Sequence, residues 1–193
     1  MPDNITQIPA PRVLLWDAMT NYVTRAWYRY FYNLYAILGS GSLRSGAFYD
    51  TTTQTAAAIN TAYAITLNNT SISQGVSIGT PTSRVYVDRT GSYNIQFSLQ
   101  LVSTSTPTAK NVYFWANVNG ASVADSARLL TILGLNYGYT PAWNFVIRMS
   151  AGDYFQLMWS TTDTNVQIAR IPAAAPAPDF PSVILTVASN IGE

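Results

Sequence analysis

The sequence predicts a mainly β protein: an antiparallel sandwich or jelly roll of about ten short strands, preceded by an extended arm and one α-helix. From residue 46 onward, apolar and polar residues alternate with the period of two that is typical of half-buried strands. Turn signals such as Asn119-Gly120 separate these segments, and no helical pattern lies between them. We therefore expect an N-terminal region over residues 1–45 and a head over residues 46–193.

The composition limits the kinds of function that the chain can have. Of its 193 residues, 48% are hydrophobic and only 10% are charged, whereas soluble domains usually have about 25% charged residues. This balance excludes intrinsic disorder and predicts that partners cover much of the surface. A net charge of +1 and a single lysine, Lys110, provide no basic patch for nucleic acid. No apolar run is long enough to span a membrane, and the N-terminus lacks the pattern of a signal peptide.

The residue types that most often perform catalysis or bind metals are scarce. Cysteine and histidine are absent, and the only glutamate is Glu193. Eight aspartates remain, and their wide spacing excludes a calcium loop of the Asp-x-Asp-x-Asp-Gly type. We predict that the protein is not an enzyme and needs no cofactor or metal.

The N-terminal region should form an extended arm followed by a helix. Pro2, Pro9 and Pro11 favour an extended backbone over the first dozen residues. The segment that follows has helical apolar spacing, which predicts a helix over about residues 20–38. Thr24 (or Thr20) is the expected N-cap, and a Gly/Ser hinge that begins at Gly39 is expected to end the helix.

Aromatic side chains lie on nearly every face of this predicted helix, so it should be buried on most sides. It either folds back onto its own head or acts as an anchor that bundles with copies of itself or inserts into another protein. We favour the anchor, because Tyr and Trp combine a large contact area with a polar tip. The expected anchor residues are Trp27, Tyr28, Arg29, Phe31, Tyr32, Leu34 and Tyr35.

The strands of the head follow from the alternation. The longest run over residues 93–101 and 143–149, and shorter ones are expected at 63–67, 76–78, 84–87, 166–171 and 183–187. Two further segments, 112–116 and 154–159, are apolar or aromatic on both faces. Because no helix of the head can cover them, they predict self-association, with closed rotational symmetry as the default.

Three segments of the head resemble the globular heads of the complement-C1q and tumour-necrosis-factor family. They are residues 91–97, residues 143–157 with an Ala-Gly-Asp turn, and residues 181–187. The resemblance implies a ten-stranded jelly roll that forms a homotrimer, with inner sheets that meet on the threefold axis through aromatic residues. The candidate trimer-interface positions are Tyr113, Trp115, Tyr154 and Met158.

Residues 46–191 also resemble modules of virion proteins from tailed bacteriophages. The core Trp-Tyr-Arg-x-Phe-x-Asn-Leu at residues 27–34 resembles N-terminal segments of phage structural proteins. Together these likenesses imply a virion structural protein, a trimeric short fibre or decoration knob that binds capsid, portal, neck or tail proteins. A collagen-like stalk and a cluster of aspartates are absent, so the receptors of the animal family are not expected.

Two other functions stay open. A tail-fibre or receptor-binding head could recognise a host-surface glycan or protein through an exposed loop over residues 135–141, where Tyr137 and Tyr139 could stack on sugar rings. Alternatively, these tyrosines pack against a neighbouring strand or subunit. A depolymerase would need two carboxylates that meet in space, for example Asp88 and Asp153. The proline-rich segment 171–181 should be an extended polyproline II loop.

Overall fold

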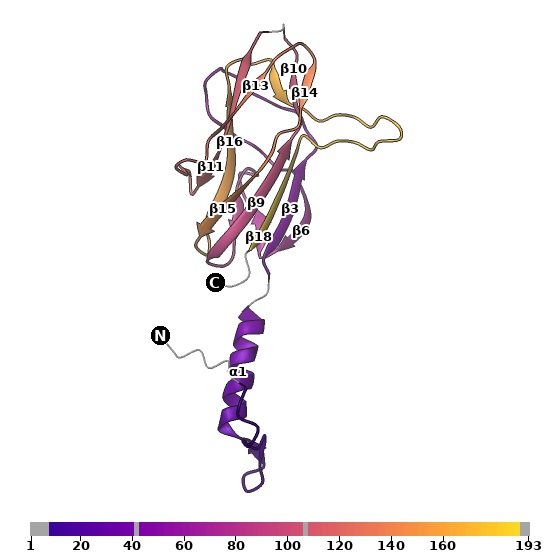
Figure 1. The fold of residues 1–193 in the computed structure, drawn as a ribbon. Coiled ribbons are helices and arrows are strands. Elements are labelled where there is room, and N and C mark those ends of the chain that lie inside the picture. Colours follow the sequence, from indigo (N-terminus) through magenta and orange to yellow (C-terminus); the bar gives the residue numbers. More distant parts are fainter. Residues whose placement is uncertain (1–7, 41–42, 106–107, 190–193) are drawn as a thin grey trace. The chain divides into compact units, whose positions relative to one another are not determined.

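The computed structural model describes residues 8–40, 43–105 and 108–189. The chain divides into two compact units, residues 1–42 and residues 43–191, which we call the N-terminal unit and the head (Figure 1). The expected boundary after residue 45 is three residues too late, because Ser45 already begins the first strand of the head and pairs with Gln74.

One layer of the head is a five-stranded antiparallel sheet. Apart from a bulge between Ala47 and Phe48, its strands pair in continuous register. Its strand order is β15 (Ala142–Met149), β9 (Gly91–Leu99), β18 (Val183–Ser189), β3 (Ser45–Asp50) and β6 (Asn69–Gln74).

The second layer is a seven-stranded sheet built around the long β11–β16 pair. In order it contains β12 (Ala121–Ser122), β11 (Lys110–Val118), β16 (Tyr154–Thr161), β8 (Val85–Val87) and β7 (Val76–Ile78). Off this path, β13 (Arg128–Ile132) pairs with β11 and β5 (Tyr63–Ala64) pairs with β16.

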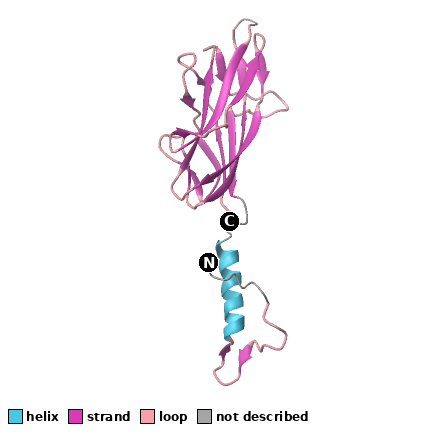
Figure 2. Ribbon diagram, turned by 60° about the vertical axis from the view of Figure 1, so that its left-hand side comes forward, coloured by secondary structure: helices cyan, strands magenta, loops and turns pink. Residues whose placement is uncertain are grey.

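A smaller four-stranded sheet completes the head, and Figure 2 shows that strands make up nearly all of its regular structure. Its strands are β14 (Tyr137–Tyr139), β10 (Leu101–Ser103), β17 (Val166–Ile168) and β4 (Gln54–Thr55). The predicted strand over residues 93–101 is divided between two sheets at Gln100. This residue accepts a hydrogen bond from Ala169 N and donates its own N–H to Ser182 O, so the chain leaves one ladder for another.

The core of the head lies between the two large sheets and confirms the alternation seen in the sequence. Phe97 is at its centre, with its ring centroid 5.8 Å from that of Phe145 and 6.3 Å from that of Phe114 on the opposite sheet. Phe145 in turn lies 6.2 Å from Phe155. Offset aromatic contacts at such distances add to the free energy of apolar burial.

The predicted Asn119-Gly120 hairpin is confirmed and connects β11 to β12. Both turn residues have positive φ, 51° and 82°, as the tight primed turns of hairpins require. Two loop predictions are wrong. Residues 137–139 form β14, which pairs with β10, and the proline-rich segment is not one extended loop but folds back on itself through bridges that join Ile171 to Phe180 and Ala174 to Ala177.

The N-terminal unit consists of a small hairpin, β1 (Trp16–Asp17) with β2 (Tyr22–Val23), and helix α1 (Arg25–Ser40). The hairpin replaces part of the expected extended arm, and Pro2 lies outside the described residues. Asp17 stabilises the turn, because its carboxylate accepts hydrogen bonds from Met19 N (2.8 Å) and Thr20 N (3.2 Å), which lowers the pKa of Asp17.

Thr24 occupies the expected N-cap position, and helix α1 begins at the next residue, Arg25. The carbonyl oxygen of Thr24 accepts from Tyr28 N at 2.9 Å, but its hydroxyl donates to Leu14 O at 2.7 Å instead of capping the helix. Gly39 does not end the helix, which continues to Ser40. The expected hinge is therefore partly helical, and residues 41–42 lie outside the described residues.

The buried carboxylate of Asp50 organises one end of the head. Its Oδ1 accepts hydrogen bonds from the amide of Thr52 (2.7 Å) and from its hydroxyl, and its Oδ2 accepts from Thr66 Oγ1 (3.2 Å). We expect Asp50→Ala to lower the free energy of unfolding by about 1–3 kcal/mol, because it removes the charged acceptor of these three hydrogen bonds. Asp50→Asn keeps an acceptor for the amide of Thr52 and should lower it less. Denaturant titration checks this, and equal losses for the two variants would contradict it.

Candidate functional site

The hairpin and the helix of the N-terminal unit are held together by local contacts. Trp27 Nε1 donates to Val13 O at 2.9 Å, and Thr24 N donates to Leu15 O at 3.0 Å. The Trp27 ring also lies against Tyr30, at 5.8 Å between centroids. Trp27, expected as an anchor residue, therefore makes its main contacts within the unit.

Other apolar side chains of this unit are left uncovered. None of the side chains described in residues 8–35 is fully buried, and this segment contains thirteen of the twenty-five exposed large hydrophobic residues described in the whole chain. Exposed apolar side chains in such number, in a segment whose described side chains form no core, are typical of an interaction surface.

The exposed aromatic residues of α1 form one stripe. Tyr28, Phe31, Tyr32 and Tyr35 follow the spacing i, i+3, i+4 and i+7, which places them on the same helix face. The three tyrosines are 60–74% exposed, and the rings of Tyr28 and Tyr32 stack at 6.3 Å. We call these four residues the aromatic stripe. Of the other expected anchor residues, Leu34 is 37% exposed, and Arg29 lines a pocket together with Val13.

The structure also brings the four expected trimer-interface residues onto one face. Trp115 on β11 is directly opposite Met158 on β16, and Tyr113 and Tyr154 lie on the same outward side of this sheet. All four are half-buried. The Tyr154 ring is partly covered, because the Tyr86 ring lies 5.4 Å away and the guanidinium of Arg84 lies 4.5 Å from the Tyr154 centroid.

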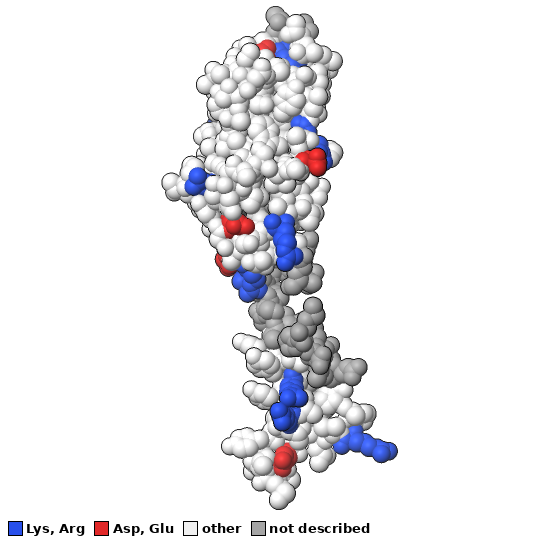
Figure 3. Space-filling view, turned by 90° about the vertical axis from the view of Figure 1, so that its left-hand side faces the viewer, with Lys and Arg blue, Asp and Glu red and all other residues white. Residues whose placement is uncertain are grey.

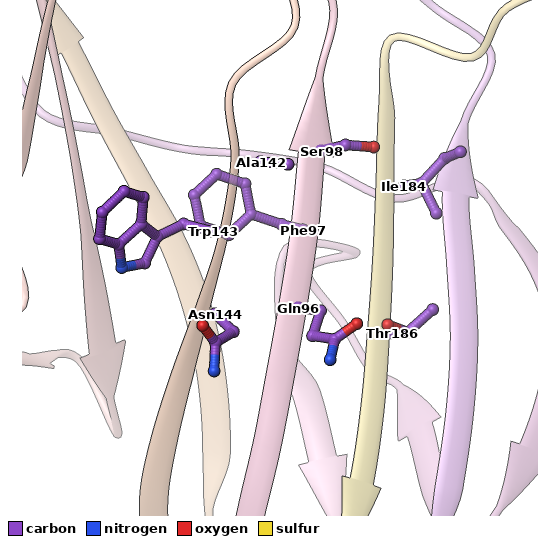
Figure 4. Close-up of a pocket in the computed structure, with 8 residues that line it drawn as sticks. All are labelled: Gln96, Phe97, Ser98, Ala142, Trp143, Asn144, Ile184 and Thr186. Carbon is purple, nitrogen blue, oxygen red and sulfur yellow. The ribbon is translucent and has the colours of Figure 1, made fainter.

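The outward face of the five-stranded sheet is a second candidate surface, which the sequence reasoning missed. Its Val146, Ile184 and Ile72 are 43–63% exposed. A groove of about 610 Å³ lies beside Ile184, and its lining combines small or uncharged polar side chains with the rings of Phe97 and Trp143 (Figure 4). Figure 3 shows how widely spaced the charged side chains are on one side of the head. The missed signal is a large apolar residue at an outward position of a strand, such as Val146 beside Asn144.

The two tyrosines expected to contact a glycan differ in exposure. Tyr137 is 57% exposed, whereas Tyr139 packs against the core, and their ring centroids are 5.8 Å apart. Only the Tyr137 ring offers a broad face to a ligand.

The aspartates of the head serve local structure. Asp88 Oδ1 forms an ion pair with Arg44 Nε at 2.7 Å. Asp153 accepts hydrogen bonds from Asn119 Nδ2 and from Ser150 N, both at 2.7 Å, and these bonds lower the pKa of Asp153. An aspartate of lowered pKa stays ionised at neutral pH, so it is poorly suited to act as the general acid of a glycosidase.

Within the described residues, no helix has the length and apolar character needed to cross a membrane.

This chain is similar to known proteins in its structure. No protein-family model matches the chain, and no curated protein matches it. The crystal structure of murine APRIL is similar at 8% sequence identity and a TM-score of 0.50, over 77% of this chain and 100% of that one. The structure of Eiger TNF from S. frugiperda is similar at 12% identity and a TM-score of 0.49, over 78% of this chain and 94% of that one.

The head resembles a TNF-like jelly roll. This confirms the expected fold class of a mainly β, antiparallel jelly roll with one helix outside it. The expected count of ten strands is not matched, because the described residues of the head form sixteen strand segments, several of only two or three residues. At 8% identity, the likeness concerns the fold alone.

Proposed function

We propose that this chain is a non-enzymatic structural protein of a bacteriophage particle. In this proposal it forms a trimeric short fibre or decoration knob, fixed to the head or neck of the virion by its N-terminal unit. The observation that supports it most is the exposed apolar surface of that unit, which includes the aromatic stripe and in which no side chain described in residues 8–35 is fully buried. The resemblance of residues 27–34 to N-terminal segments of phage structural proteins favours a virion protein as the partner of this surface.

The proposed anchor works by burial of surface and by hydrogen bonding. The rings of the aromatic stripe provide apolar area, and the hydroxyls of its three tyrosines need polar partners once they are covered. The charged residues described in this unit are Arg12, Asp17, Arg25 and Arg29. The excess of arginine favours a partner surface that combines an apolar groove with acidic groups at its rim.

Self-association of the head is the second part of the proposal, and the TNF-like fold favours a trimer. We assign the contact to the outward face of the five-stranded sheet. Its exposed valine and isoleucines gain most from burial, and its small neighbours, such as Ala47 and Ala188, allow close approach. The face of Trp115 and Met158, expected from the sequence, is the competing site.

Introducing a lysine on one face at a time distinguishes the two candidate interfaces. In a head fragment that begins at Leu43, we expect Val146→Lys to convert trimers into monomers, because an ammonium group would be buried without a partner. Met158→Lys should leave the trimer intact. Both side chains point away from the core, so both variants should fold. Mass by light scattering checks this, and the reverse pattern would transfer the interface to the face first expected.

Attachment should depend on the aromatic stripe. We expect the double substitution Tyr28→Ser and Tyr35→Ser to reduce incorporation into phage particles at least tenfold, because both exposed rings lose their contact with the particle. Tyr137→Ser, which removes an equally exposed tyrosine from the head, is the matched control and should incorporate normally. The amount of the chain in purified particles measures this. Normal incorporation of the double variant would refute the anchor.

A receptor-binding head is the second candidate function, and the exposed ring of Tyr137 favours it. If that ring stacks on a sugar, Tyr137→Ala should abolish glycan binding, whereas Tyr137→Phe should retain it because stacking needs the ring and not the hydroxyl. A glycan array probed with the full chain tests both variants. Binding that survives Tyr137→Ala would remove this candidate site.

A further inference from the structure

The segment between β17 and β18 forms a narrow arm that leaves the body of the head. In Figure 1 it is the golden-yellow loop that projects on the side of β3 and β6. Arg170 and Asp179 form an ion pair at its base, and Asp179 Oδ1 also accepts from Ala173 N at 2.6 Å. Ala174 and Ala177 exchange two backbone hydrogen bonds, at 3.1 and 2.8 Å, near its tip. We call residues 171–180 the arm.

The arm has the composition of a contact element. Residues 172–178 are only alanine and proline, and most of their side chains are exposed. No side chain of this stretch can form a hydrogen bond with water or an ion pair with a charged group. Ile171 and Phe180 at its base are each 37% exposed. Burial of this exposed apolar surface against another surface would lower the free energy of the assembly.

A groove of matching chemistry lies at the opposite edge of the head. It has a volume of about 300 Å³, and its lining includes Phe97, Phe114, Leu129, Pro141, Ala142 and Trp143. Arg128 also lines the groove, and its guanidinium covers one face of the half-exposed Trp143 ring at 4.8 Å, so the other face of the ring is the one open to a ligand. Proline-rich segments bind in aromatic-lined grooves, because proline rings pack flat on indole and proline has no backbone N–H to leave unpaired.

The positions of arm and groove decide which molecule the arm can reach. Trp143 belongs to β15, the edge strand farthest from β6 in the five-stranded sheet, whereas the arm projects on the β3–β6 side (Figure 1). The arm therefore points away from the groove of its own head. Two complementary patches at opposite edges of one molecule form a heterologous contact, which generates a closed ring when the rotation closes.

We propose that the arm of one head binds in the Trp143 groove of the next copy of this chain, so that arms link the heads of the assembly in one rotational direction. This inference rests on the proposed self-association and adds a specific contact to it. We choose a second copy of this chain as the occupant, and not a foreign peptide, because every copy carries one proline-rich arm and one aromatic-lined groove. In a closed ring, each arm then has one groove to bind.

Cross-linking the full chain tests the contact directly, because the natural chain contains no cysteine. Ala142 at the groove and Ala175 on the arm are both exposed, so either can be replaced without loss of core packing. We expect a bis-maleimide to join Ala142→Cys chains to Ala175→Cys chains when the two are mixed and reassembled. A chain with both substitutions should give covalent trimers. Ala57→Cys, an exposed alanine of another loop, replaces Ala175→Cys in the control pair and should give at least tenfold less product.

A further variant shows whether the groove itself makes the contact. Trp143 also lines the groove of the proposed trimer face, so light scattering must show that the variant still assembles. In the assembled, doubly substituted chain, Trp143→Ala should reduce the covalent product at least tenfold, whereas Leu133→Ala, which removes an exposed leucine outside the groove, should not. If heads assemble but cross-link no better than the Ala57→Cys control, or if Trp143→Ala has no effect, the arm contact is refuted and self-association stands. Heads that stay monomeric by light scattering would refute the proposed self-association itself.

Discussion

The structure depends on one constraint: the N-terminal unit cannot bury its own apolar surface. One helix and two strands of two residues make a single layer, and a single layer has no interior. Trp27 and Thr24 attach the hairpin to the helix, but these contacts leave the aromatic stripe open. We infer that a partner covers this surface, and on this ground we propose that the chain is a component of a particle.

The head is the opposite case, because it is complete as an isolated fold. Two sheets enclose a continuous aromatic and aliphatic core that extends from Phe48 to Phe155, and the buried carboxylate of Asp50 has hydrogen-bond donors for both oxygens. The exposed apolar side chains of the head are therefore not defects of packing. They lie at outward strand positions and on the arm, outside the core of the head.

Many of the elements that could be predicted from the sequence are strands buried on one side only. In β9, each core residue from Tyr93 to Leu99 alternates with a polar residue, so periodicity alone finds the strand. By contrast, β6 and β14 are largely exposed and have no such alternation, and β14 is placed by its pairing with β10. The expected interface residues do share one face, but the sequence could not show that Tyr86 and Arg84 cover Tyr154.

Trimer formation and attachment reinforce each other in the proposed function. One aromatic stripe of four residues is a small interface, and ordering its side chains on binding costs free energy. Three stripes connected through one trimeric head convert the second and third binding events into intramolecular ones, so overall affinity rises without any new contact. A short chain of low charge can thus hold firmly to a particle. The same linkage means that loss of head trimerisation weakens attachment even when every stripe is intact.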